Sequence, residues 1–194
     1  MAVGRELLLI LALILVIAVL IKVIEFFQVD VVEADASKFV MEDLRAKYPG
    51  ADVSVMTITS KTNDNGARYF EVKARVTEDP DSQCPERSHI FYNYPAQNFI
   101  PQPPEVITSG CVVCTEGLCT IAFPEEAIIA SHTFPGTITV KSYLSENPDA
   151  VPSVLEKPDS WLVRWDLQEA DSFVTVGVHR NGTITSVEEG QKSG

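Results

Sequence analysis

Histidine is scarce in this chain, which limits the kinds of site that it can build. The 194 residues include three histidines, His89, His132 and His179, and no two of them stand four residues apart. The sequence therefore gives no support to a histidine-built metal site on one helix face. A glycine-rich phosphate loop is also missing from the sequence. We predict no catalytic residue and no cofactor.

The remaining acid–base and nucleophile candidates are weak for geometric reasons. Glu125 and Glu126 are adjacent, so on a helix their carboxylates point apart and do not act as a pair. Ser131 precedes His132 outside any nucleophile elbow. A Ser–His or Cys–His pair would have to be assembled by the fold. These patterns favour a protein without catalytic activity.

Basic residues are outnumbered by acidic ones, 15 to 27, which gives a net charge of −12. The charges of the first 29 residues, Arg5, Glu6, Lys22 and Glu25, cancel, so the acidity belongs to the rest of the chain. Nucleic acids and anionic lipid surfaces attract Lys/Arg patches, so we expect no nucleic-acid partner. An acidic surface fits an exported domain that stays soluble.

The sequence begins with a long apolar run. Leu7 to Ile21 carries no polar side chain, and apolar residues continue past Lys22 to Val29. At ~1.5 Å per residue, a helix over Leu7–Val29 covers the ~30 Å hydrocarbon core of a bilayer. We predict a single-pass transmembrane anchor over residues 1–29, embedded in the cell membrane as a signal-anchor. Its N-terminus is cytoplasmic and residues 30–194 are extracytoplasmic.

Two alternatives give this run another role. Ala34-Asp35-Ala36 has the shape of a signal-peptide cleavage site, which would remove the run after export. Gly4, followed by Glu6, resembles the processing site of pilin-type subunits, in which the helix assembles a filament. The anchor and the cleaved signal both export the rest of the chain.

A helix followed by a hairpin is predicted over residues 30–79. Asp35 or Ser37 can cap the helix, and Pro49-Gly50 ends it. Two segments of strand character, 53–58 and 69–76, flank a turn at 63–66. The helix places apolar side chains on one side at steps of three and four residues: Phe39, Val40, Leu44 and Tyr48.

Residues 136–194 repeat this order. Thr137–Glu146 is predicted as a short helix and Trp161–Leu167 as a strand, and Asn181-Gly182 joins strands over 173–178 and 183–187. Four residues recur at an offset of 99, which makes an internal duplication a hypothesis. They are Pro49, Ala51, Ser54 and Val55, matched by Pro148, Ala150, Ser153 and Val154.

These two segments resemble the PepSY and wider cystatin-like modules, in which a sheet wraps one helix. The resemblance rests on Arg68-Tyr69-Phe70-Glu71-Val72 and on the stretch from Val174 to Ile184. It covers the two ends of the exported part and does not extend to residues 80–135. It implies a binding, inhibitory or assembly role for a small exported or tethered module, and it carries over no functional residue.

Residues 80–135 are rich in proline and contain all four cysteines: Cys84, Cys111, Cys114 and Cys119. In an exported domain two disulfides are favoured, with Cys84–Cys111 and Cys114–Cys119 as one of three possible pairings. A zinc site on all four cysteines is the first alternative, because Cys111 and Cys114 have C-x-x-C spacing. A redox-active Cys111–Cys114 pair is the second. A helix is predicted over 125–132.

The segment from Ser88 to Pro104 combines aromatic residues with four prolines. It is compatible with a strand that leads into an extended segment read by a partner. We favour the simpler interpretation of a stiff loop whose rings cover the core.

The sequence thus predicts an α+β protein in which antiparallel sheet packs on one or two helices behind a transmembrane helix. Its exported part consists of a helix–hairpin unit (30–79), a Cys/Pro-rich insertion (80–135) and a second helix–hairpin unit (136–194). The expected function is a membrane-anchored binding or assembly module. Its expected partners are the lipid bilayer, through Leu7–Val29, and a protein or peptide. A zinc or redox protein and a structural subunit of a filament or complex are the alternatives.

Overall fold

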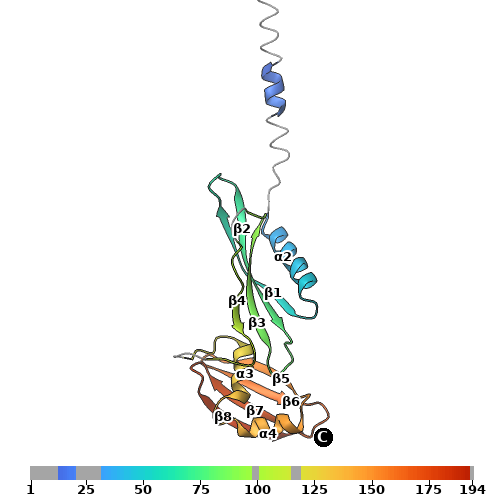
Figure 1. The fold of residues 1–194 in the computed structure, drawn as a ribbon, viewed down its shortest axis with the longest axis vertical. Helices are drawn as coiled ribbons and strands as arrows, with labels where there is room; N and C mark the ends of the chain where they lie inside the picture. The colour runs from blue at the N-terminus through green and yellow to red at the C-terminus, as the bar shows by residue number, and fades with distance from the viewer. Residues whose placement is uncertain (1–12, 21–31, 98–100, 115–118, 193–194) are drawn as a thin grey trace, which may run out of the picture. The chain divides into compact units, whose positions relative to one another are not determined.

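The computed structural model describes residues 13–20, 32–97, 101–114 and 119–192. The chain divides into two compact units, Met1–Val32 and Glu33–Gly194. The second unit contains two four-stranded antiparallel sheets, one with a single helix packed on it and the other with two (Figure 1).

The predicted transmembrane helix and signal-anchor are wrong. Among the described residues, no helix is both long and apolar enough to cross a membrane. Residues 13–20 are helical and exposed. The rest of the predicted span, and Gly4 before it, lie outside the described residues.

The first sheet is a meander in the order β1-β2-β3-β4, and helix α2 packs on one of its faces. Strand alternation places the apolar side chains of β2 on the helix side, against the apolar stripe of α2. The bounds are α2 Glu33–Lys47, β1 Asp52–Thr62, β2 Arg68–Glu78, β3 Glu86–Tyr94 and β4 Glu105–Thr108. The buried pairing surface consists of Ala36, Val40, Leu44, Phe70, Val72, Ala74 and Val76.

The predicted cap of α2 is misplaced, although the helix itself is confirmed. The helix begins at Glu33, so Asp35 and Ser37 lie within its first turns. The Ala34-Asp35-Ala36 motif forms part of that first turn, where Ala36 is fully buried. Phe39 remains 45% exposed, since the buried stripe runs through positions 36, 40 and 44.

The second sheet has the order β5-β6-β7-β8. Helix α3 crosses β5, β6 and β7, and α4 contacts α3 and β7. The two tryptophans of β6, Trp161 and Trp165, are buried under these helices. The bounds are α3 Pro124–Thr133, α4 Ile138–Glu146, β5 Val151–Glu156, β6 Ser160–Asp166, β7 Ser172–His179 and β8 Ile184–Gln191.

The two sheets agree with the hypothesis of an internal repeat. In each, a helix precedes four antiparallel strands that follow one another in sequence order. Helices α2 and α4 end at Lys47 and Glu146, and strands β1 and β5 begin at Asp52 and Val151, so both pairs are 99 residues apart. This is the offset at which the sequence identities recur.

Residues 80–135 are divided between the two sheets. They supply β3 and β4 to the first sheet, and α3 to the second. The stiff loop favoured for the aromatic segment is wrong over residues 88–94, which lie in β3. Successive side chains of β3 point to opposite faces of the sheet, so Phe91 lies on one face and Tyr92 and Tyr94 lie on the other. The strand is paired on both sides, with β2 and β4.

Candidate functional site

All four cysteines are in disulfides. Cys84 bonds to Cys111 and Cys114 bonds to Cys119. The first bridge ties the β2–β3 connection to the turn that follows β4. A four-cysteine zinc site would need four free thiolates, so such a site and these two disulfides exclude each other.

The Cys84–Cys111 disulfide is held by a tight turn. Gly110 and Cys111 have φ of 64° and 62°, and Ser109 pairs with Val112 across them. Positive φ at both central positions is the pattern of a type I′ turn. A non-glycine residue in this left-handed region costs about 1–2 kcal/mol, which the rest of the fold must supply. The turn therefore fixes the direction of the Cys111 side chain.

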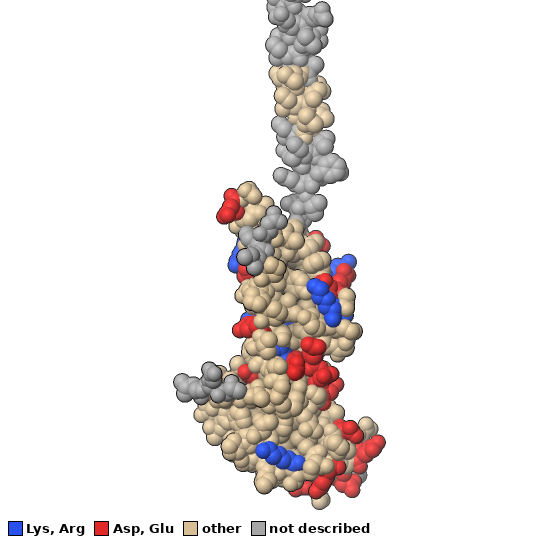
Figure 2. Space-filling model, in the orientation of Figure 1, with Lys and Arg blue, Asp and Glu red and all other residues tan. Residues whose placement is uncertain are grey.

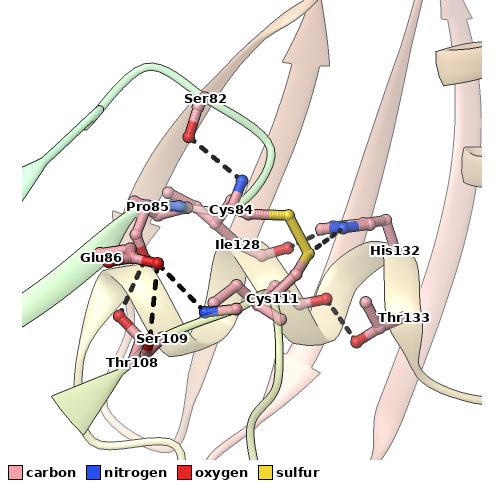
Figure 3. Close-up of a disulfide and its surroundings, with 12 residues drawn as sticks. Ser82, Cys84, Pro85, Glu86, Thr108, Ser109, Cys111, Ile128, His132 and Thr133 are labelled. Atoms are coloured by element: carbon pink, nitrogen blue, oxygen red, sulfur yellow. Dashed lines mark hydrogen bonds between the residues drawn. A yellow bond between two sulfur atoms is a disulfide. The ribbon is translucent and has the colours of Figure 1, made fainter. Parts of the chain in front are cut away.

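His132 of α3 lies beside this disulfide, and its ring is oriented by the backbone (Figure 3). Its Nδ1 is 3.0 Å from the carbonyl oxygen of Ile128. A carbonyl oxygen can only accept, so Nδ1 carries the proton and donates it. Nε2 then presents a lone pair 3.4 Å from the Sγ of Cys111. The fold thus assembles a Cys–His pair that no spacing in the sequence indicated.

The environment keeps the imidazole of His132 neutral. Burial lowers its pKa below the ordinary histidine value, and the charge of Lys141 acts in the same direction. The ring of Trp165 meets the His132 ring edge-on, with centroids 5.5 Å apart. Three potential metal-ligand atoms lie within 4.8 Å of one another here, one each from Cys84, Cys111 and His132.

A buried ion pair links the first sheet to α3. Arg87 of β3 donates from Nη1 to Glu125 Oε2 at 2.9 Å, and the two side chains are only 4% and 6% exposed. Thr77 donates to the other carboxylate oxygen at 2.8 Å. Burial alone would raise the pKa of Glu125, but the hydrogen bonds from Arg87, its own backbone and Thr77 bring it below the ordinary value. Glu125 is therefore an ionised structural group.

His89 stands beside this pair, with both ring nitrogens engaged. Its Nε2 accepts from Nε of Arg87 at 3.2 Å, so Nδ1 is the protonated nitrogen and donates to Glu105 at 3.1 Å. Burial lowers the pKa of His89. Because Arg87 occupies Nε2, this Glu–His pair has no free nitrogen with which to take a proton from a substrate.

The other sequence candidates also have structural partners. Ser131 donates to the Ile128 carbonyl and accepts from Trp165 Nε1, so it is not directed at His132. Glu126 accepts from the backbone N–H groups that precede α3, while Glu125 faces Arg87. The adjacent carboxylates point apart, as predicted. His179 accepts from the backbone N–H of Asn181 beside the β7–β8 turn.

A groove of about 560 Å³ runs beside the edge strand β8. One wall is the α3–α4 connection, residues 134–136, and the other is residues 182–187. Within the described part of the chain, β8 is paired only with β7, so its outer edge has no strand beside it. The sequence predicted the strand but gave no sign of the groove, since residues about 50 positions apart form its walls.

No family model and no curated protein matches this chain. One similar solved structure is the crystal structure of a candidate lipoprotein from Clostridium difficile 630. It is 12% identical, with 78% of this chain and 90% of that chain covered and a TM-score of 0.21, which is too low to indicate a shared fold.

Proposed function

We propose that residues 33–194 form an extracytoplasmic binding module without catalytic activity, which takes an extended basic segment of a partner protein as an added strand on β8. The observation that carries this proposal is the groove between residues 134–136 and the outer edge of β8. An unpaired strand edge offers a row of N–H and C=O groups, and adding a strand satisfies them.

The groove supplies contacts for side chains as well as for the backbone. Phe134 and Pro135 on one wall face Ile184 and Val187 on the other. Alternate residues of an added strand point to one side, so its apolar side chains would fall into this groove. Ile138, just beyond the groove wall, is 77% exposed and would extend the apolar contact.

Charge favours a basic partner over a second copy of this chain. Glu188 and Glu189 of β8 are exposed, and the chain has a net charge of −12. In the view of Figure 2, acidic side chains gather along the right-hand side of the region of the second sheet. Two acidic edges placed side by side repel, whereas lysine or arginine in an extended segment is attracted.

Two further observations support the location and the absence of catalysis. The disulfides favour an oxidising compartment, where such bonds persist. His89 and Ser131 have their polar atoms engaged in structural hydrogen bonds. The helix-and-meander arrangement of both sheets also fits the resemblance to PepSY and cystatin-like modules, which implies binding.

The test uses the full-length chain and two synthetic decapeptides, one alternating valine with lysine and the other alternating valine with glutamate. We expect the lysine peptide to bind and to slow amide hydrogen exchange in β8 and around the groove. The glutamate peptide is expected not to bind. Binding of neither peptide, or protection confined to another strand, would contradict the proposal.

A charge-matched pair of variants sharpens this test. Glu188→Lys with Glu189→Lys should weaken binding of the lysine peptide at least tenfold. Glu42→Lys with Asp64→Lys changes the net charge equally at exposed positions of α2 and the β1–β2 turn, away from β8. Equal weakening by both pairs would indicate a general charge effect and no site on β8.

A further inference from the structure

We infer that Cys84, Cys111 and His132 form a zinc site when the Cys84–Cys111 disulfide is reduced. The three potential ligand atoms already lie within 4.8 Å of one another. They come from the β2–β3 connection, the turn after β4 and helix α3, so the folded chain holds them together from three directions (Figure 3). Neither Cys114 nor Cys119, which belonged to the zinc site considered from the sequence, takes part.

The Cys111–His132 distance suits a shared metal ion. With Zn–S near 2.3 Å and Zn–N near 2.05 Å, tetrahedral geometry separates a sulfur and a nitrogen ligand by about 3.6 Å. The observed separation of Sγ and Nε2 is 3.4 Å. The two sulfurs must move apart to about 3.8 Å, which side-chain rotation can provide once the covalent bond between them is broken.

His132 is also prepared as a ligand by its other nitrogen. Histidines that bind a metal usually donate the second ring N–H to a carboxylate, a carbonyl or a water molecule, which fixes the ring and its tautomer. Here Nδ1–H donates to the carbonyl of Ile128, and the edge contact with Trp165 orients the ring. The lone pair of Nε2 is thereby directed at the sulfur of Cys111.

The chemistry balances with an external dithiol as the reductant. The dithiol transfers two electrons and two protons to the disulfide, becomes a disulfide itself and leaves two protein thiols. Zn²⁺ then displaces one proton from each thiol and also binds the Nε2 lone pair. Three protein ligands leave a fourth position for water or for a group from a partner. In the reverse direction, an external disulfide takes two electrons from the two thiolates and, with two protons, becomes a dithiol, while the Cys84–Cys111 disulfide re-forms and the metal is released.

The site is tested by native mass spectrometry of the full-length chain with Zn²⁺, before and after reduction by a phosphine. We expect no zinc on the oxidised chain and one zinc per reduced chain. Replacing zinc by Co²⁺ should give a thiolate-to-cobalt charge-transfer band. His132→Ala should weaken zinc binding at least tenfold, and Cys84→Ser with Cys111→Ser should abolish it.

Cys114→Ser with Cys119→Ser is the matched control, because it removes the other disulfide and leaves the three ligands in place. This variant should bind zinc like the reduced parent chain. Loss of zinc in this control, or zinc retained without Cys84 and Cys111, would overturn the inference. Near-ultraviolet circular dichroism reports whether the reduced chain stays folded. If it unfolds, zinc must restore the fold in the parent chain and fail to do so in His132→Ala, and any other result counts against the site.

Discussion

The two sheets of residues 33–194 share a topology but are stabilised by different means. The first has longer outer and central strands, β1 and β2, and a single helix over a core of mostly small and aliphatic side chains. The second has strands of six to eight residues, two helices and two buried tryptophans. The same topology is thus compatible with two different hydrophobic cores. Topology determines which faces of the sheets and helices are buried, but it does not determine which side chains fill the space between them.

The largest expected difference concerns the core of the second sheet. Trp165 is fully buried, so Trp165→Ala should lower the free energy of unfolding by about 3–5 kcal/mol. Native-state hydrogen exchange should show the loss mainly in β5 to β8. Leu44→Ala is the corresponding variant in the first sheet, and it should speed amide hydrogen exchange mainly in β1 to β4. Equal loss in both sheets from either variant would show that they unfold as one cooperative unit.

The ion pair that connects the sheets provides the next test. Arg87→Met leaves the buried carboxylate of Glu125 without its charged partner and should cost about 3–5 kcal/mol in urea unfolding. Arg87→Met combined with Glu125→Leu should recover most of this loss, because no unpaired charge remains. A double variant as unstable as the single one would mean that the pair itself, and not the avoidance of a lone charge, stabilises the contact.

The two disulfides should differ in their contribution. They close loops with sequence separations of 27 and 5 residues. Restriction of the unfolded chain gives about 3.5 kcal/mol for the longer loop and about 2 kcal/mol for the shorter one. Cys84→Ser with Cys111→Ser should therefore lower the melting temperature more than Cys114→Ser with Cys119→Ser, as measured by calorimetry. The reverse order would contradict the loop-entropy account.

A smaller effect is expected from pH. The pKa of His89 is lowered in the folded state, chiefly by burial, so its stability contribution is complete above the unfolded value of about 6.5. It is lost as the pH falls through the folded pKa, when protonation of Nε2 would set a cation against Arg87. His89→Gln should reduce the slope of the urea midpoint between pH 7 and 5. His132 should contribute to the slope in the same direction, because burial lowers its pKa as well.

The smallest effect is expected on the open face of the first sheet. Lys61 and Glu71 form an ion pair at 2.7 Å, with side chains 43% and 40% exposed. Exposed pairs contribute about 0–1 kcal/mol, so Lys61→Ala should shift the urea midpoint only slightly, and the shift should vanish at high salt. If Lys61→Ala lowered the free energy of unfolding as much as Arg87→Met, the ion pair would not be in contact with solvent, contrary to its exposed position in the structure.

Local patterns in the sequence were sufficient for helices α2, α3 and α4 and for both hairpins. Turn residues and apolar periodicity act within a few positions, so they can be interpreted without the fold. Strands β4 and β5 were not predicted. They are short, and β5 contains Pro152, which is tolerated because β5 is an edge strand. Edge position is a property of the sheet, not of the segment.

By itself, the sequence determined the acidic character and the α+β class and favoured two disulfides, because these depend on composition and on spacing along the chain. It left three pairings of the four cysteines open, and the tertiary structure selected Cys84–Cys111 and Cys114–Cys119. Only the tertiary structure decided that His132 meets Cys111, that Arg87 meets Glu125 and that β8 borders a groove. Each of these contacts joins residues 21 or more positions apart, and their distances are set by how helices pack on sheets. Such contacts can be identified only from the fold, because the residues next to one partner in the sequence give no indication of the other partner.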